Sequence, residues 1–106
     1  MPAGWLDFIL GAQKELIESS PIPVIITDLE GRPVEVNRAC CDLTGYSREE
    51  LLGTQFGFLN FPEDTTHNKA LFQSIVEKGF AEGIPWRLRA KNGEQLRLLA
   101  TAYVVG

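Results

Sequence analysis

The chain has 106 residues, of which 44% are hydrophobic and 23% charged, a composition typical of one ordinary globular domain. Ten lysine and arginine residues against fourteen acidic ones give a formal net charge of −4, which argues against a nucleic-acid-binding surface. No apolar run approaches the roughly 20 residues that a membrane span needs, and no signal peptide is recognisable. The two cysteines, Cys40 and Cys41, are adjacent and cannot form an ordinary loop-closing disulfide with each other. A reduced, cytoplasmic setting is therefore expected.

Residues 1–20 predict an amphipathic helix from about residue 4 to residue 19. Large apolar side chains recur there at near-helical spacing, and Pro21 and Pro23 then end the helix. Such a helix is costly to leave in water, so we expect it to form a homodimer contact. The alternative is an arm that lies on whatever apolar surface is available. The large apolar residues are Trp5, Phe8, Ile9, Leu16 and Ile17.

The stretch from residue 23 to residue 52 predicts a strand, a tight turn, a second strand and two short helices. β-branched residues favour a strand at 24–28, and alternation favours another at 33–37. Asp28 and Gly31 supply the turn chemistry between them. Because Pro33 lacks an N–H, the second strand should lie at an edge of its sheet.

Capping signals bound the two short helices, expected at residues 38–44 and 48–52. Asn37 stands at the N-cap of the first helix, and Gly45 at its left-handed C-terminal position. The segment Ser-Arg-Glu-Glu at 47–50 has the Ser-x-x-Glu pattern of a capping box, which opens the second helix.

A long helix follows, predicted from a cap at Asp64 to about Lys78, with Gly79 ending it. A second hairpin is expected beyond it, because Asn92-Gly93 is the strongest short hairpin signal. Alternation sorts the flanking residues onto two faces. The face expected toward the helix carries Trp86, Leu88, Ala90, Leu96, Leu98, Ala100, Ala102 and Val104. The outward face carries Arg87, Arg89, Lys91, Arg97, Leu99, Thr101, Tyr103 and Val105.

In this order the pieces resemble the PAS family of sensory domains over roughly residues 20 to 105. The resemblance rests on the segments ITD (26–28), GR (31–32), NRA (37–39), TGYSREELLG (44–53), PED (62–64) and RLRAKNGE (87–94). It implies an α+β fold, with an antiparallel sheet and flanking helices. It also implies a non-catalytic sensory or dimerisation module, which passes a signal to a downstream output domain in a protein such as a sensor histidine kinase.

PAS domains place their fifth strand in the middle of the sheet, between the first and the fourth. No segment after the predicted fourth strand corresponds to it. We therefore expect residues 21–106 to be a PAS domain truncated before its fifth, central strand, with residues 1–20 as a flanking helix. Direct pairing, the N-terminal segment or strand swapping with another copy could close the gap.

The resemblance implies a small-ligand site between the long helix and the sheet. The pocket-facing residues, chosen by alternation and helical phase, are Val36, Phe56, Phe58, Leu71, Ile75, Trp86, Leu88 and Leu98. A one-residue error in strand register would invert the strand members. A ligand-free protein-interaction domain is one alternative, and a cofactor-bearing redox or gas sensor is another.

Flavin is the first cofactor alternative. PAS-superfamily photoreceptors carry Gly-x-Asn-Cys-Arg-Phe-Leu-Gln after the short helices, and residues 53–60 here read GTQFGFLN. Phe56 replaces the adduct-forming cysteine and Gly57 the phosphate-binding arginine, so light-driven adduct chemistry is not expected. Non-covalent flavin would use Trp86, Gln55 and Asn60 for stacking and hydrogen bonding.

Haem is less favoured than flavin. His67, the sole histidine, shares its helical phase with Leu71 and Ile75, but it lies in the first turn of the long helix. No zinc site is expected from the two adjacent cysteines, nor is a nucleophile–base pair or a phosphate loop recognisable. The outward basic residues of the second hairpin are either a solvated strand face or a docking surface for a downstream helix or effector.

Overall fold

The computed structural model describes residues 17–55 and 57–104. Most of the predicted N-terminal helix therefore lies outside the described residues, although residues 17–19 are helical. The elements are β1 (Ile25–Thr27), β2 (Pro33–Val36), α2 (Arg38–Thr44), α3 (Arg48–Leu51), the 3-10 helix η1 (Pro62–Asp64), α4 (Thr65–Lys78), β3 (Phe80–Arg89) and β4 (Gln95–Tyr103). This order agrees with the α+β prediction.

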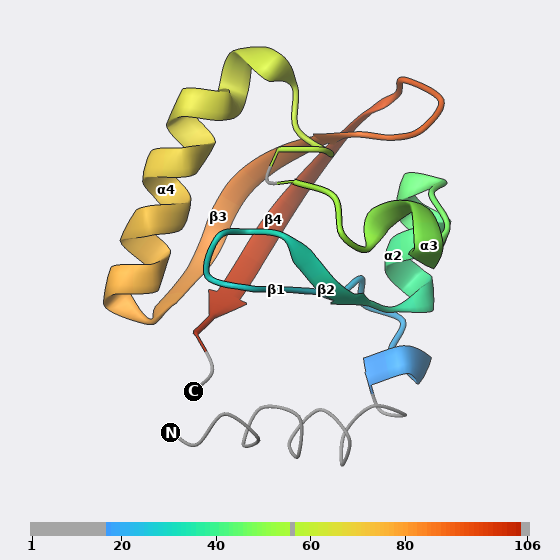
Figure 1. The fold of residues 1–106 in the computed structure, drawn as a ribbon, viewed down its shortest axis with the longest axis horizontal. Coiled ribbons are helices and arrows are strands. Elements are labelled where there is room, and N and C mark those ends of the chain that lie inside the picture. Colours follow the sequence, from blue (N-terminus) through green and yellow to red (C-terminus); the bar gives the residue numbers. More distant parts are fainter. Residues whose placement is uncertain (1–16, 56, 105–106) are drawn as a thin grey trace.

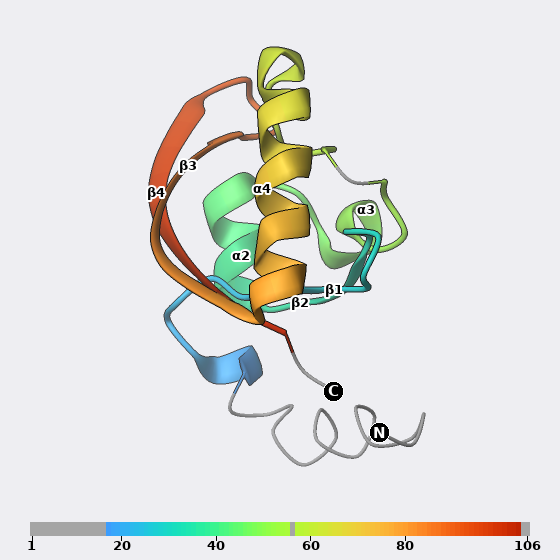
Figure 2. The same ribbon diagram turned by 90° about the vertical axis from the view of Figure 1, so that its left-hand side faces the viewer.

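Strands β3 and β4 form a long, curved hairpin, and the other elements lie on its concave side (Figures 1 and 2). Helix α4 lies along one end of that side, α2 and α3 lie at the other, and the β1–β2 hairpin closes the front (Figure 1). Both hairpins are antiparallel, and within the described residues they form two separate two-stranded sheets. The concave side therefore holds the core.

Alternation along the second hairpin is confirmed by burial. Leu88 is 8% exposed on the concave side, whereas Leu99 on the convex side is 78% exposed. Trp86 pairs with Leu98, and Leu88 with Leu96, so these four side chains share one face. The strand begins at Phe80, before Trp86, which is the first residue that alternation assigns to a face.

The earlier start of β3 has a physical reason. Gly83 and Pro85 are residues that favour a loop, but the strand accommodates them. Its register shifts between Ala81 and Ile84, and Gly83 takes a φ of 67° there. Such an irregularity lets a strand bend without ending, which adds to the curvature of the hairpin.

The short-helix caps are confirmed. Asn37 Oδ1 accepts a hydrogen bond from the Cys40 N–H at 3.0 Å, and Gly45 has a φ of 81° with its N–H bonded to Cys41 O at 2.8 Å. Ser47 and Glu50 form the predicted capping box. The prediction that the Asp64 side chain caps the long helix is wrong, although its position is right. Asp64 precedes α4 but makes no side-chain cap bond, because its carboxylate binds Arg87 instead.

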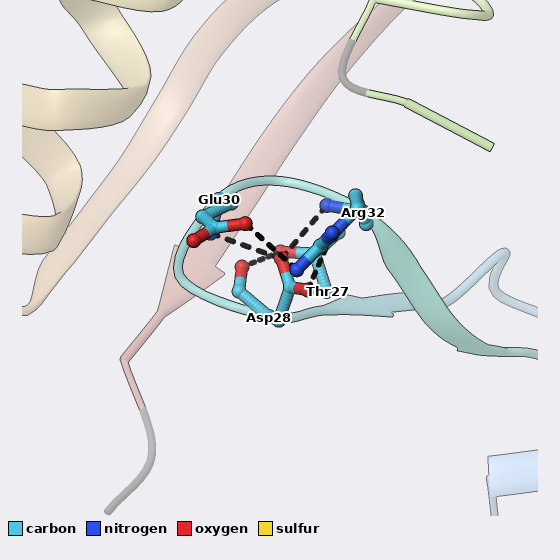
Figure 3. A network of polar contacts seen from close by, with 4 residues as sticks. All are labelled: Thr27, Asp28, Glu30 and Arg32. Atoms are coloured by element: carbon cyan, nitrogen blue, oxygen red, sulfur yellow. Dashed lines mark hydrogen bonds and ion pairs between the residues drawn. The ribbon is translucent and has the colours of Figure 1, made fainter. Parts of the chain in front are cut away.

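The turn between β1 and β2 is held by its own side chains (Figure 3). Asp28 Oδ1 accepts from the N–H groups of Glu30 at 2.9 Å and Arg32 at 3.0 Å, while Arg32 Nε donates to Oδ2 at 2.9 Å. The Arg32 backbone N–H makes the largest contribution to lowering the pKa of Asp28. Gly31 supplies the left-handed residue, with a φ of 84°.

The core is centred where α2, α3 and β2 meet the concave side of the second hairpin. We call this group the core cluster. Its buried members are Val36, Cys40, Leu51, Leu59 and Leu88, with Cys41, Tyr46, Trp86, Leu96 and Leu98 packed against them. Ile75 of α4 and Ile84 of β3 are also buried. The cluster joins residues from both hairpins, so it connects two sheets that share no strand pairing in the part of the chain that the structure describes.

Candidate functional site

The predicted pocket residues divide into two groups in the structure. Val36, Trp86, Leu88 and Leu98 all belong to the core cluster. Ile75 is buried and Leu71 half-buried on α4, outside that cluster. Phe58 is 39% exposed, and its ring meets Tyr46 edge-on with centroids 5.0 Å apart. Phe56 lies outside the described residues.

Residues 59–64, which we call the crossing segment, are bound to β3 through three residue pairs. The Arg89 N–H donates to Leu59 O at 2.7 Å, and Trp86 Nε1 donates to Asn60 Oδ1 at 3.1 Å. Arg87 Nη2 donates to Asp64 Oδ1 at 3.0 Å. Figure 1 shows this segment passing beside the upper part of β3 before it enters α4. These bonds fix one wall of the concave side.

The Trp86–Asn60 bond is the polar feature at the margin of the core cluster. Asn60 is buried, and Trp86 is half-buried against the cluster. A buried amide needs a partner, because desolvating it without one costs about 1–3 kcal/mol. The indole N–H meets that need. Sequence reasoning had named both residues as hydrogen-bonding or stacking candidates, but nothing in the sequence indicated that they bind each other.

The Arg87 side chain, predicted to face outward, is held by contacts with the crossing segment. Its guanidinium pairs with Asp64, lies 3.3 Å from a Glu63 carboxylate oxygen and stacks 4.4 Å from the centroid of the Phe61 ring. The hydrogen bond from Arg87 lowers the pKa of Asp64 below its ordinary value. Charge-assisted bidentate contacts of this kind are the stronger class of hydrogen bond.

Lys91 is likewise engaged. Its ammonium binds Glu50 Oε2 at 2.8 Å and lies 5.8 Å from the centroid of the Tyr46 ring. Of the basic residues predicted to face outward, Arg87 and Lys91 are therefore held in surface ion pairs. Arg89 and Arg97 are exposed, as expected. The bond from Lys91 is the largest cause that lowers the pKa of Glu50.

Two surface hollows lie beside the core cluster rather than within it. One, of about 460 Å³, is lined by Gly53, Thr54, Gln55, Gly57 and Phe58. The other, of about 450 Å³, lies between α2 and the β3–β4 turn, lined by Asp42, Leu43, Thr44, Gly45, Ala90, Lys91, Asn92 and Glu94. Gln55 and Phe58 are the predicted site residues that line the first hollow.

The remaining candidates for metal or redox chemistry are His67, Cys40 and Cys41. His67 is exposed in the first turn of α4. Both cysteines are free thiols, and burial raises the pKa of Cys40 to about 11 and also raises that of Cys41. A thiol needs a lowered pKa to be a good nucleophile. Across residues 17–55 and 57–104, no three His, Cys, Asp or Glu side chains are grouped to hold a metal ion.

The family model of the PAS fold matches residues 13–105 of this chain. The chain belongs to the PAS family. The curated probable diguanylate cyclase DgcE of Escherichia coli (strain K12) is 42% identical over 65 residues, which are 61% of this chain and 6% of that protein. The chain thus corresponds to a small part of that relative's length.

Two solved structures show how closely the fold matches. One domain of the sensory box sensor histidine kinase/response regulator from Geobacter sulfurreducens has a TM-score of 0.79 and 29% identity, covering 94% of this chain and 87% of that chain. The Rhodobacter sphaeroides LOV protein has a TM-score of 0.81 at 19% identity, covering 94% of this chain and 58% of that chain. Both structures share the fold of this chain. Among the described helices of this chain, none combines the length and apolar character required for crossing a lipid bilayer.

Proposed function

We propose that this PAS domain is a non-catalytic sensory module, which binds a small, largely apolar ligand on the concave side of the β3–β4 hairpin. The observation that carries the proposal is the convergence of Val36, Trp86, Leu88 and Leu98 on one cluster, with the Asn60–Trp86 bond at its margin. Ligand sites are mostly apolar, with a few placed polar groups that orient the ligand.

The Asn60–Trp86 bond gives such a ligand a way to change the protein. An acceptor atom on the ligand would compete with Asn60 Oδ1 for the Trp86 N–H. Losing that bond would weaken one of the three attachments between the crossing segment and β3. A typical hydrogen bond contributes about 0.5–1.5 kcal/mol, which overlaps the couplings of about 1–3 kcal/mol that link sites in allosteric proteins. The resulting change in how the crossing segment packs on β3 would pass to an output domain outside this chain.

Flavin is the alternative occupant, with Trp86, Gln55 and Asn60 as its contacts. It is supported by the adjacency of Trp86 and Asn60 and by the place of Gln55 in the neighbouring hollow. Haem has weaker support, because an axial ligand at His67 would come from an exposed side chain. A ligand-free interaction domain is the remaining alternative.

We also propose that the domain works as a homodimer in the cytoplasm, through its N-terminal helix and the convex face of the second hairpin. Leu99 on that face is largely exposed, and Phe80, which pairs with Tyr103, is 44% exposed. Exposed apolar groups of this size often mark an interface. Within the described residues β1 pairs with β2 and β4 with β3, which supports a PAS domain at residues 21–106 that lacks its central strand. Strand swapping between copies would provide a pairing partner for the outer edges of β1 and β4.

The first test is a visible absorption spectrum of the purified domain, which separates flavin and haem from colourless occupants. A panel of small apolar compounds bearing one hydrogen-bond acceptor is then screened for a rise in melting temperature. Trp86→Phe keeps a ring but removes the indole N–H, so it should reduce the shift caused by any active compound. Leu99→Ala, on the convex face, should keep the shift, and Leu29→Ala, in the exposed β1–β2 turn outside the proposed homodimer face, is the matched control.

Two outcomes would count against the proposal. If no compound raises the melting temperature and nothing co-purifies, the ligand-free interaction domain becomes the better account. If an active compound shifts wild type and Trp86→Phe equally while Leu99→Ala loses the effect, the ligand binds the convex face instead.

A further inference from the structure

Asn37 makes more hydrogen bonds than its capping role requires. The side chain is fully buried, and Oδ1 accepts from the N–H groups of Val24 at 2.9 Å and Cys40 at 3.0 Å. Nδ2 donates to the carbonyl oxygens of Ile17 at 3.0 Å and Ile22 at 2.8 Å. A carboxamide offers two donors and two acceptor sites, so one side chain uses its whole hydrogen-bonding capacity.

These bonds divide into two sets with different requirements. Capping α2 needs only an acceptor, which Ser, Thr or Asp supplies as well as Asn. The two donors serve residues 17–24 alone, which we call the incoming segment. The backbone N–H of Asn37 also reaches Val24 O at 3.1 Å. Asn is the residue that can cap the helix and bind the carbonyl oxygens of the incoming segment at once.

Prolines limit the backbone hydrogen bonding of the incoming segment. Pro21 and Pro23 have no N–H to donate, and residues 21–23 are all exposed. Ile22 N–H binds Ser20 Oγ within the segment itself. The Asn37 side chain binds this segment at three backbone groups, the Val24 N–H and the carbonyl oxygens of Ile17 and Ile22.

We infer that Asn37 is a positioning residue that couples the incoming segment to α2 and the core cluster. Its neighbours Val36 and Cys40 are both buried in that cluster. A displacement of residues 17–24 pulls directly on the amide that caps α2, and a rearrangement of α2 moves the incoming segment in return. Energetic coupling between two sites is reciprocal. This inference needs no ligand, so it survives if the proposed sensing role fails.

The forward test uses hydrogen exchange on wild type, Asn37→Ser and Asn37→Asp. Both variants keep an acceptor that can cap α2 and lose the two donors; Ser avoids a buried charge, and Asp stays closer in size to Asn. Losing the bonds to the Ile17 and Ile22 carbonyl oxygens lets the incoming segment open more often, so we expect the Ile22 and Val24 amides to exchange about tenfold faster in both variants, even though each variant keeps an acceptor for the Val24 N–H. Rates are compared with that of the Gly79 amide, which bonds Ile75 O at the end of α4. Unchanged relative rates at Ile22 and Val24 overturn the inference.

The reverse test leaves Asn37 intact and loosens the incoming segment with Pro21→Gly and Pro23→Gly together. Coupling predicts that the Cys40 and Cys41 amides exchange at least threefold faster relative to Gly79. The matched control is Pro62→Gly, which loosens the start of η1 and should leave those two amides unchanged. If the control raises the Cys40 and Cys41 rates as much as the double variant, the effect is general softening and the coupling is refuted.

Discussion

Replacing Leu88 by Ala tests the face assignment on which the proposed site depends. The change removes the equivalent of about three methylene groups, each worth about 0.8 kcal/mol when fully buried. Leu88 is 8% exposed, so the lost transfer free energy is about 2 kcal/mol. The residual cavity adds to this, giving a loss of about 3 kcal/mol, within the usual range of about 2–5 kcal/mol.

Leu99→Ala is the matched control, because the chemical change is identical and the strand is the partner of β3. Leu99 is 78% exposed, so the same substitution should cost only about 0.5 kcal/mol. Urea unfolding of the monomeric domain measures both losses, because Leu99 would be buried in the proposed homodimer. At an m-value of about 1.5 kcal/mol per M, Leu88→Ala should lower the midpoint by about 2 M and Leu99→Ala by a few tenths. Equal losses, or a larger loss for Leu99→Ala, would refute the face assignment and the ligand site with it.

Three further changes probe local features. Gly45→Ala should cost about 1–2 kcal/mol in urea unfolding, because Gly45 has a φ of 81°, and Gly45→Asn should cost less; equal costs would contradict this cause. Asp64→Asn should be destabilising at neutral pH. Its cost should shrink as the pH falls below the ordinary Asp value of 3.8, because a lowered folded-state pKa adds stability only while the carboxyl is ionised; a pH-independent cost would contradict the Arg87 contact as its source. With a thiol reagent at neutral pH, Cys41→Ser, which retains only the buried Cys40, should react more slowly than Cys40→Ser. Equal rates would mean that Cys40 is not protected.

Features set by neighbouring residues could be predicted from the sequence. Asn37, Gly45 and the Ser47–Glu50 pair occupy their predicted cap positions because each cap depends on side chains within one helical turn. The Asn92-Gly93 turn and the alternation along β3 and β4 are equally local. Together with the resemblance to the PAS family, these signals were sufficient for the fold class.

Features set by distant chain segments could not be predicted. Asp64 has the composition of a helix cap, but Arg87 competes for its carboxylate, and only the tertiary path of the crossing segment brings the two together. Alternation placed Arg87 outward without revealing its partners. The Nδ2 bonds of Asn37 depend on where residues 17–24 run, which no local pattern records. Ligand binding by the core cluster stays a prediction. The residues expected to contact the ligand are Val36, Trp86, Leu88 and Leu98.

The separation into two hairpins has a consequence for how the chain folds. Each hairpin closes between strands that are neighbours in sequence, so its loop-closure entropy is small. The bond from Arg89 N–H to Leu59 O and the contact of Lys91 with Glu50 join more distant residues. We expect the hairpins to form early and to collapse onto each other late, so that substitutions in the crossing segment accelerate unfolding and leave the folding rate nearly unchanged.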